Sequence, residues 1–158
     1  KTADVDIIEA ETVCPGKYIV IITGELSAVN ASVEAAKTLH AMHLIDSFVL
    51  GNPADEIFPA IYGASKVEIV NSLGIIETYD AAAIIVAADQ AAKTAEVSLI
   101  EIRLARGMCG KSYLLITGEV AAVEAAIARA QKAVEPRGMF LDSSVIARPD
   151  KKLIDQIL

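Results

Sequence analysis

The sequence is poor in the residues that build disulfide frameworks, aromatic cores and membrane spans. Its 158 residues include two cysteines, no tryptophan, four tyrosines and three phenylalanines. The longest unbroken apolar run is residues 81–88, which lies between Asp80 and Asp89. A run of this length is too short to cross a bilayer, so we predict no membrane partner.

Clusters of positive charge are also lacking. The formal net charge is −7, and no block of Lys and Arg occurs. Sequence-independent binding of nucleic acid requires neutralisation of phosphates, so we predict no nucleic-acid partner. No basic and apolar leader opens the sequence, so secretion is not indicated. We expect a cytosolic protein without a structural disulfide.

What the sequence does contain is an internal repeat. Residues 1–5 return with one change as residues 93–97, and residues 16–17 and 22–25 return as residues 110–111 and 116–119. A period near 94 is too long for a solenoid unit, so each copy is expected to be a small domain. We therefore predict two domains, residues 1–66 and residues 67–158. Fused copies are typical of symmetric or ring-like assemblies, so function is expected between subunits as well as within one chain.

The hydrophobic pattern of the second copy predicts a βαββαβ order, which is a ferredoxin-like α+β fold. In such a sheet the first strand normally lies between the third and the fourth. The second helix should bury Val123, Ile127, Ala130 and Val134, which recur at helical spacing. The predicted strands cover residues 72–77, 98–105, 112–117 and 139–146, and the helices cover residues 80–92 and 119–134 and start again at 150.

The first copy follows the same plan from its second strand onward. We predict strands at residues 6–12, 18–23 and 44–50, a short helix at 55–62, and a longer helix with Val29, Val33 and Ala36 facing inward. This copy lacks a counterpart of residues 71–92. Because loss of an inner strand leaves unpaired backbone groups beside the core, we expect an N-terminally shortened version of a longer chain. The alternative is a rearranged sheet in which another segment fills the gap.

Both cysteines fall in the equivalent turn between the second and third strands of their copies. An isolated cysteine often serves as a small apolar residue. Cys14 differs, because it belongs to the rigid turn Val-Cys-Pro-Gly-Lys at a sheet edge. A metal or cluster site needs three or four soft ligands, more than one chain supplies. Three copies of this loop around a threefold axis would supply three.

No catalytic constellation emerges, and we predict that the protein is not an enzyme. His40 and His43 are expected to be surface or capping residues, and Lys111 lacks the pattern of a phosphate-binding lysine. A Cys-dependent enzyme or a ligand-binding regulator on the same scaffold stays an alternative. Four carboxylates on or near predicted strands are expected to face solvent: Glu9, Glu11, Glu77 and Glu101.

Four segments, residues 73–78, 87–97, 117–120 and 145–149, together resemble the shell-protein domain of bacterial microcompartments. The resemblance covers all of the second copy and the later three quarters of the first. Tandem copies with a cysteine in the turn at residues 12–17 are similar to one branch of that family, the trimeric shell proteins of the propanediol-utilisation type. The resemblance implies a homotrimer that imitates a hexamer, located in the microcompartment shell within the cytoplasm.

In that branch the turn cysteine of three chains holds a 4Fe-4S cluster at the central pore, and Cys14 matches its position. The implied role is electron transfer or redox sensing, with other shell proteins and a possible redox enzyme of the lumen as partners. The alternative is a shell tile whose axis is a metabolite pore without a cluster. The residues expected to line the pore are Val13, Pro15, Gly16, Lys17, Gly107, Met108, Cys109, Gly110 and Lys111.

Two edge positions of the family match Lys93 and Arg148, which are expected to help neighbouring tiles pack. Their counterparts in the first copy are Lys1 and Asn52. Because Asn52 departs from the arginine of the family pattern, the edge of the first copy should be weaker. Cys109 is a second departure, and it would form a second ring of thiols near the axis or be inert.

Overall fold

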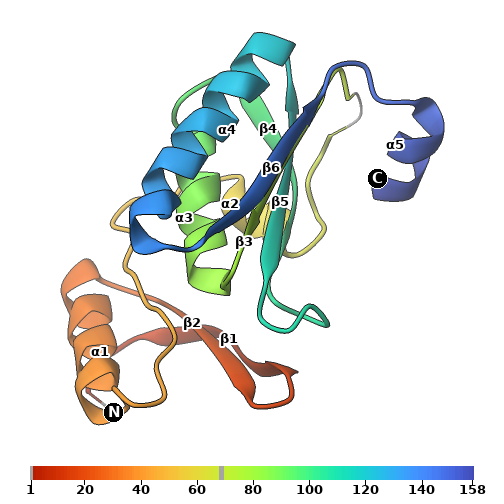
Figure 1. The fold of residues 1–158 in the computed structure, drawn as a ribbon. Helices are drawn as coiled ribbons and strands as arrows, with labels where there is room; N and C mark the ends of the chain where they lie inside the picture. The colour runs from red at the N-terminus through yellow and green to blue at the C-terminus, as the bar shows by residue number, and fades with distance from the viewer. Residues whose placement is uncertain (1, 68–69) are drawn as a thin grey trace.

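The helices and strands fall into two unequal modules (Figure 1), one with its elements between residues 6 and 61 and one with its elements between residues 73 and 157. The computed structural model describes residues 2–67 and 70–158. Both modules combine antiparallel strands with helices, which confirms the predicted mixed α/β class. Within the described ranges, no helix combines the length and apolar character that crossing a bilayer requires.

The second module has the predicted βαββαβ order. Its four strands form one antiparallel sheet in the order β4-β5-β3-β6, so the first strand of the module lies between the third and fourth, as expected. The elements are β3 (Leu73–Thr78), α3 (Ala81–Ala92), β4 (Val97–Arg103), β5 (Ser112–Gly118), α4 (Val120–Val134), the 3-10 turn η1 (Glu135–Arg137), β6 (Phe140–Ile146) and α5 (Lys151–Ile157).

Helices α3 and α4 pack side by side on one face of this sheet. The carboxylate of Asp80 caps α3 by accepting the N–H of Ala83 at 2.6 Å. A Cβ at Gly74 on β3 would lie 2.6 Å from Cγ1 of Val123, so only glycine lets α4 approach the strand this closely. The predicted inward stripe of α4 is confirmed, since all four of its residues are buried: Val123, Ile127, Ala130 and Val134.

The first module is less complete. Its elements are β1 (Asp6–Cys14), β2 (Lys17–Thr23), α1 (Leu26–Leu39) and α2 (Ile57–Ile61). Strands β1 and β2 pair with each other in a separate two-stranded sheet. No described segment occupies the place that β3 takes in the second module, so the alternative of a rearranged sheet is not observed.

Two predictions for the first module are wrong, and both errors trace to this gap. Residues 44–50 form no strand, because the equivalent strand β6 is paired to β3, and the first module offers no such partner among its described residues. Ala36 is exposed rather than inward, while Val29 and Val33 are only half-buried. Among residues 2–67 and 70–158, no helix packs along α1 as α3 packs along α4.

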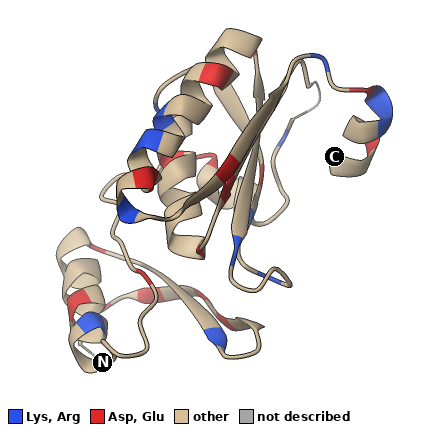
Figure 2. Cartoon of the chain, in the orientation of Figure 1, with Lys and Arg blue, Asp and Glu red and all other residues tan. Residues whose placement is uncertain are grey.

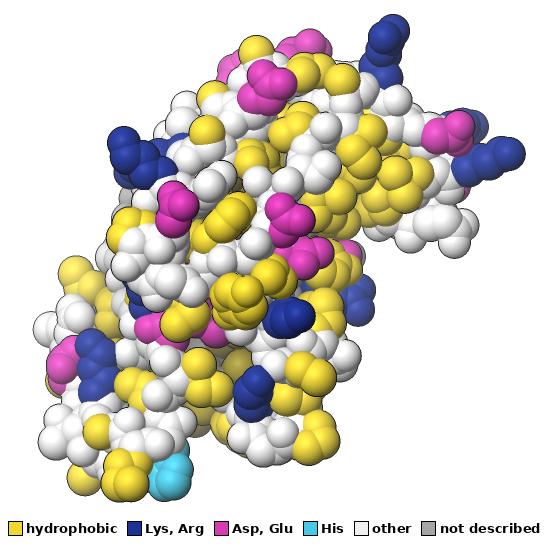
Figure 3. Space-filling model, viewed as in Figure 1, with side chains coloured by type: hydrophobic (Ala, Val, Ile, Leu, Met, Phe, Trp, Pro, Cys, Tyr) yellow, Lys and Arg dark blue, Asp and Glu magenta, His cyan; other side chains and the backbone are white. Residues whose placement is uncertain are grey.

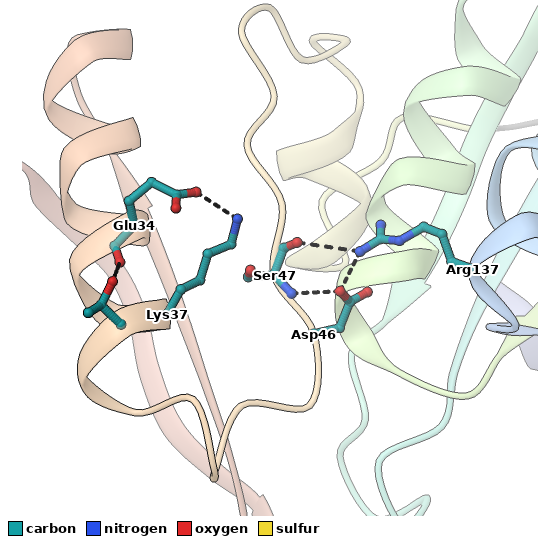
Figure 4. Close-up of polar contacts among 6 residues, drawn as sticks. Glu34, Lys37, Asp46, Ser47 and Arg137 are labelled. Atoms are coloured by element: carbon teal, nitrogen blue, oxygen red, sulfur yellow. Dashed lines mark hydrogen bonds and ion pairs between the residues drawn. The ribbon is translucent and has the colours of Figure 1, made fainter.

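The end of the first module completes the core of the second. Ile57 and Ala60 on α2 are 1% and 0% exposed, and they pack with the residues between β4 and helices α3 and α4. Figure 4 shows a second link, in which the guanidinium of Arg137 binds the carboxylate of Asp46 and lies 3.4 Å from the carbonyl of Ser47. The predicted boundary between residues 66 and 67 stays a prediction.

Candidate functional site

The turns that equivalent strands form in the two modules lie side by side (Figure 1). We call residues 13–17 and 104–111 the paired turns. The N–H of Gly107 donates to the carbonyl of Val13 at 3.2 Å, and Nζ of Lys17 donates to the carbonyl of Cys109. The structure thus brings together, from distant parts of the sequence, the two groups of residues that were expected to line a pore.

Turn chemistry explains the local shape of the first of these turns. Cys14, the last residue of β1, pairs with Lys17, the first residue of β2, and Pro15 and Gly16 lie between them. Proline presets the backbone at the first central position of a turn, and Gly16 has a φ of +78°, which favours glycine at the second. This hairpin end places Cys14 beside the turn of the second module.

The second turn is longer and more strongly bent. Gly107 and Gly110 have φ of +71° and +92°, while Ala105 and Cys109 reach +55° and +56° without being glycine. Left-handed backbone is costly for residues with a Cβ, so the surrounding contacts must hold it. Lys17 is one such contact, since its Nζ donates to the carbonyl of Cys109. A Cβ on Gly110 would lie 2.8 Å from the same Nζ.

The two cysteines are free and differ in accessibility. Cys14 is half-buried and Cys109 is exposed. Within the described ranges of a single chain, no group of three or more His, Cys, Asp and Glu side chains is placed to hold a metal ion. A cluster ligated by Cys14 therefore needs thiols from further copies of the chain, as the sequence argument requires.

An ion-pair network joins the two modules behind the turns. The guanidinium of Arg106 in the second turn binds the carboxylates of Glu9 and Glu11 on β1. Its hydrogen bond to Glu9 raises the pKa of Arg106 above its usual value. Glu9 is only 9% exposed, so the expectation that it faces solvent is wrong. Arg106 supplies the charge that makes burial of this carboxylate tolerable.

A second carboxylate, Glu101 on β4, also has partners. Oε2 accepts the hydroxyl of Tyr113 at 2.9 Å, and Oε1 accepts Nε of Arg103 at 2.9 Å. Burial, followed by the neighbouring Glu101, raises the pKa of Tyr113 above its usual value. Glu101 is therefore half-buried and bonded rather than freely solvated, whereas Glu77 is exposed as expected.

The remaining candidate side chains stand apart from the paired turns. His40 ends α1, where its N–H donates to the carbonyl of Ala36 at 2.9 Å, and His43 follows it on the surface. Both positions fit the expected surface and capping roles. Lys111 is exposed, and Met108 is half-buried in the second turn.

Two of the four predicted edge residues contact each other within one chain. Nζ of Lys93 binds Asp89 at 2.7 Å and donates to the carbonyl of Asn52, so two of the four meet within one chain. Arg148 is exposed, with a φ of +71°. Lys1 lies outside the described residues, and the tile-edge role of the set stays a prediction.

Sequence reasoning missed Arg106 and the bridging role of Lys17. The signal for Arg106 was available, because it is a basic residue that the otherwise similar turn of the first module lacks. The partner of Arg106 could not be predicted, because Glu9 lies far from Arg106 in the sequence. Only the packing of the two modules brings these side chains together.

Comparisons with known proteins identify the family of the chain. The BMC domain family matches residues 1–53 and 72–149. The bacterial microcompartment shell protein PduT of Citrobacter freundii is 34% identical over 158 residues, which is all of this chain and 86% of that protein.

Two solved structures are also similar. A microcompartment protein from Desulfitobacterium hafniense DCB is 46% identical, with a TM-score of 0.87 over 98% of this chain and 86% of that one. A fused permuted hexameric shell protein from the RMM microcompartment shares the fold, at 20% identity and a TM-score of 0.58 over 85% of this chain and 70% of that one. The chain therefore belongs to the BMC-domain family, as a structural shell protein of a bacterial microcompartment that carries two such domains in tandem.

Proposed function

We propose that three copies of the chain form a ring-shaped shell tile in which the paired turns surround a threefold axis. Cys14 of each copy then ligates one shared 4Fe-4S cluster. The observation that carries this proposal is the position of Cys14 at the end of the β1 hairpin, where the turn of the second module lies beside it. The full-length similarity to PduT adds support for the assembly of such a tile.

The residues present suit this group. Thiolates are the ligands that iron-sulfur clusters prefer. Cys14 offers one at a turn with open space, because a Cβ on Gly16, two residues further on, would meet no atom within 4 Å outside its chain neighbours. Lys17 is paired with Cys14 across the hairpin, and its ammonium group, which donates to the carbonyl of Cys109, adds positive charge to the paired turns. Three thiolates leave one iron to a non-protein ligand or solvent. When bound, the cluster supplies one-electron transfer across the shell or a response to oxidation state.

A second candidate function is a tile whose axis is a metabolite pore without a cluster. The glycines of the paired turns favour it, because Gly16 and Gly107 have open space around their backbones. The amide of Gly16 would line an opening suited to a small polar or anionic metabolite, whereas the N–H of Gly107 is taken up by the carbonyl of Val13. Other shell proteins remain the expected neighbours of the tile under either function.

Iron analysis separates the two functions. Protein prepared without oxygen should contain about four iron and four sulfide per three chains, with visible absorption from the cluster. Cys14→Ser should remove the iron and leave the native mass unchanged, whereas the matched control Cys109→Ser should keep both. Unchanged iron in Cys14→Ser would overturn the cluster assignment, and colourless, iron-free wild-type protein would favour the pore.

The third possibility, a Cys-dependent enzyme or a ligand-binding regulator, predicts a different assembly. Electron microscopy of the overexpressed protein should show sheets or tubes if the chain is a shell tile. A dispersed protein that binds a small ligand would contradict the tile.

A further inference from the structure

The two lysines that end the paired turns lie in different environments. Lys17 is half-buried, and its Nζ crosses to the second turn, where it donates to the carbonyl of Cys109. Its equivalent in the repeat is Lys111, which is exposed. Figure 2 shows basic segments on the β1–β2 hairpin and on the turn between β4 and β5. The chain therefore uses one of two equivalent lysines to bridge the turns and leaves the other on its surface.

The position that receives Lys17 requires a glycine. Gly110 is buried, and a Cβ on it would lie 2.8 Å from Nζ and 2.9 Å from Cδ of Lys17. Only glycine leaves room there for the lysine side chain, and it also suits the φ of +92°. We call the space over such a turn glycine, together with the carbonyl of the residue before it, a lysine seat.

The repeat places a second lysine seat in the first turn. A shift of 94 residues pairs Gly16 with Gly110, and Pro15 with Cys109. Gly16 has the same left-handed backbone, with a φ of +78°. It is exposed, and a Cβ on it would meet no atom within 4 Å outside its chain neighbours. The seat of Gly110 is thus filled within the chain, whereas the seat of Gly16 is open to solvent.

We infer that Lys111 of one copy fills the lysine seat of Gly16 in the next copy and donates to the carbonyl of Pro15 there. This inference rests on the proposed tile, in which the second turn of each copy lies beside the first turn of the next. The direction is consistent, because Lys17 reaches from a first turn to a second turn within the chain. Bridges within chains and bridges between chains then alternate around the axis.

This bridge makes Lys111 a positioning residue for Cys14 of the neighbouring copy. Pro15 follows Cys14 directly, so an ammonium group bound to its carbonyl fixes the turn that carries the thiol. A hydrogen bond from a charged donor is about twice as strong as a neutral one. The bridge also adds positive charge beside the axis, and Figure 3 shows Lys and Arg side chains on the surface over both turns.

Amine labelling of the assembled full chain tests the inference. A short pulse of an N-hydroxysuccinimide ester acylates the neutral form of lysine, and a hydrogen bond to a carbonyl favours the charged form. In the tile, Lys17 and Lys111 should both react about tenfold or more slowly than the exposed Lys132. On dilution to single chains, Lys111 should become as reactive as Lys132, while Lys17 stays protected within the chain. Peptide mass spectrometry measures each rate, and native mass spectrometry measures the assembly.

Substitution of the seat glycine is the second test. Asparagine tolerates left-handed backbone, and in Gly16→Asn its side chain fills the seat. Lys111 of this variant should then be acylated as fast as Lys132. Gly138→Asn is the matched control, because Gly138 has a φ of +70° and open space but lies outside the paired turns. In Gly138→Asn, Lys111 should stay protected.

The reduction potential of protein that holds the proposed cluster tests the positioning role. Lys111→Met should lower this potential relative to Lys132→Met, because loss of a nearby positive charge disfavours the added electron. If copies assemble but Lys111 is acylated as fast as Lys132, Gly16→Asn leaves it protected, or the two methionine variants have equal potentials, this inference fails and the tile stands. If wild-type chains never associate, the proposed tile itself fails. If the tile holds no iron, the proposed cluster fails and amine protection still decides the bridge.

Discussion

The two modules are copies of one domain, yet they are stabilised differently. In the second module a four-stranded sheet and two packed helices enclose a core of fully buried side chains. In the first, a two-stranded sheet and α1 bury no helical side chain completely. The first module also contacts the second through Glu9 and Glu11, Asp46 and α2. Similar sequence therefore gives similar local structure, while burial depends on neighbouring elements.

The largest expected difference between the modules is the loss of stability when an inward-facing helix residue is truncated. Val123 on α4 and Val29 on α1 are equivalent in the repeat, but Val123 is 0% exposed and Val29 is half-buried. Val123→Ala should lower the free energy of unfolding by about 2–3 kcal/mol through lost burial and a residual cavity. Val29→Ala should cost less than about 1 kcal/mol. Urea denaturation measures both, and equal losses would contradict the difference between the modules.

A smaller difference in stability is expected when the arginine partners of two carboxylates are removed, Glu9 on β1 and Glu101 on β4. Arg106→Ala leaves the buried Glu9 without its cross-module partner and should cost about 1–2 kcal/mol, a value reduced because half of Arg106 is exposed. Arg103→Ala removes the partner of the more accessible Glu101 and should cost about 0.5 kcal/mol.

Thermal unfolding of these two variants checks the comparison. Arg106→Ala should lower the free energy of unfolding less when it is combined with Glu9→Gln, because that variant no longer carries the buried charge of Glu9. Arg103→Ala serves as the control for removal of an arginine from the same face. An equal or larger loss in Arg103→Ala would show that the junction between modules contributes no more than a surface pair.

The smallest expected effect concerns pH and is confined to the second module. Burial raises the pKa of Asp80 above its ordinary value of 3.8, despite the N–H that its carboxylate accepts from Ala83. The folded state therefore binds the Asp80 proton more tightly than the unfolded state. The contribution of Asp80 to stability should rise as the pH falls through the raised pKa towards 3.8, and should fall as the pH rises.

Urea titrations of the wild type and Asp80→Asn between pH 7 and 4 measure this contribution as a difference. Asparagine keeps the capping oxygen but cannot titrate, so other acidic groups cancel from the comparison. The wild type should gain relative to Asp80→Asn on acidification. A relative loss would mean that the cap hydrogen bonds outweigh desolvation at this carboxylate.

The sequence predicted the second module well, because its elements have clear periodicity and chemical boundaries. Asp80 starts a helix, and the four inward positions of α4 recur at helical spacing. Prediction failed at residues 44–50 and at Ala36, where the pattern is right but the packing partner is absent among the described residues. Periodicity reports which face a residue would bury, and it does not report whether a neighbour is there to cover it.

The site was predictable in part for the same reason. Turn chemistry and the repeat located both loops, and the structure brings them together. The bridge from Lys17 to Cys109 and the pairing of Arg106 with Glu9 depend on how the modules pack, which no local pattern encodes.

Insertion of α2 into the second module also fixes the composition of any assembly. The two modules belong to one chain, so they are produced together and in equal number. Because Ile57 and Ala60 are buried in the core of the second module, the two modules also stay packed together. In the proposed ring of three copies joined head to tail, the two kinds of module would alternate around the circumference. Properties that only one kind carries, including a half-buried thiol in the first turn, recur at every other position rather than at all of them.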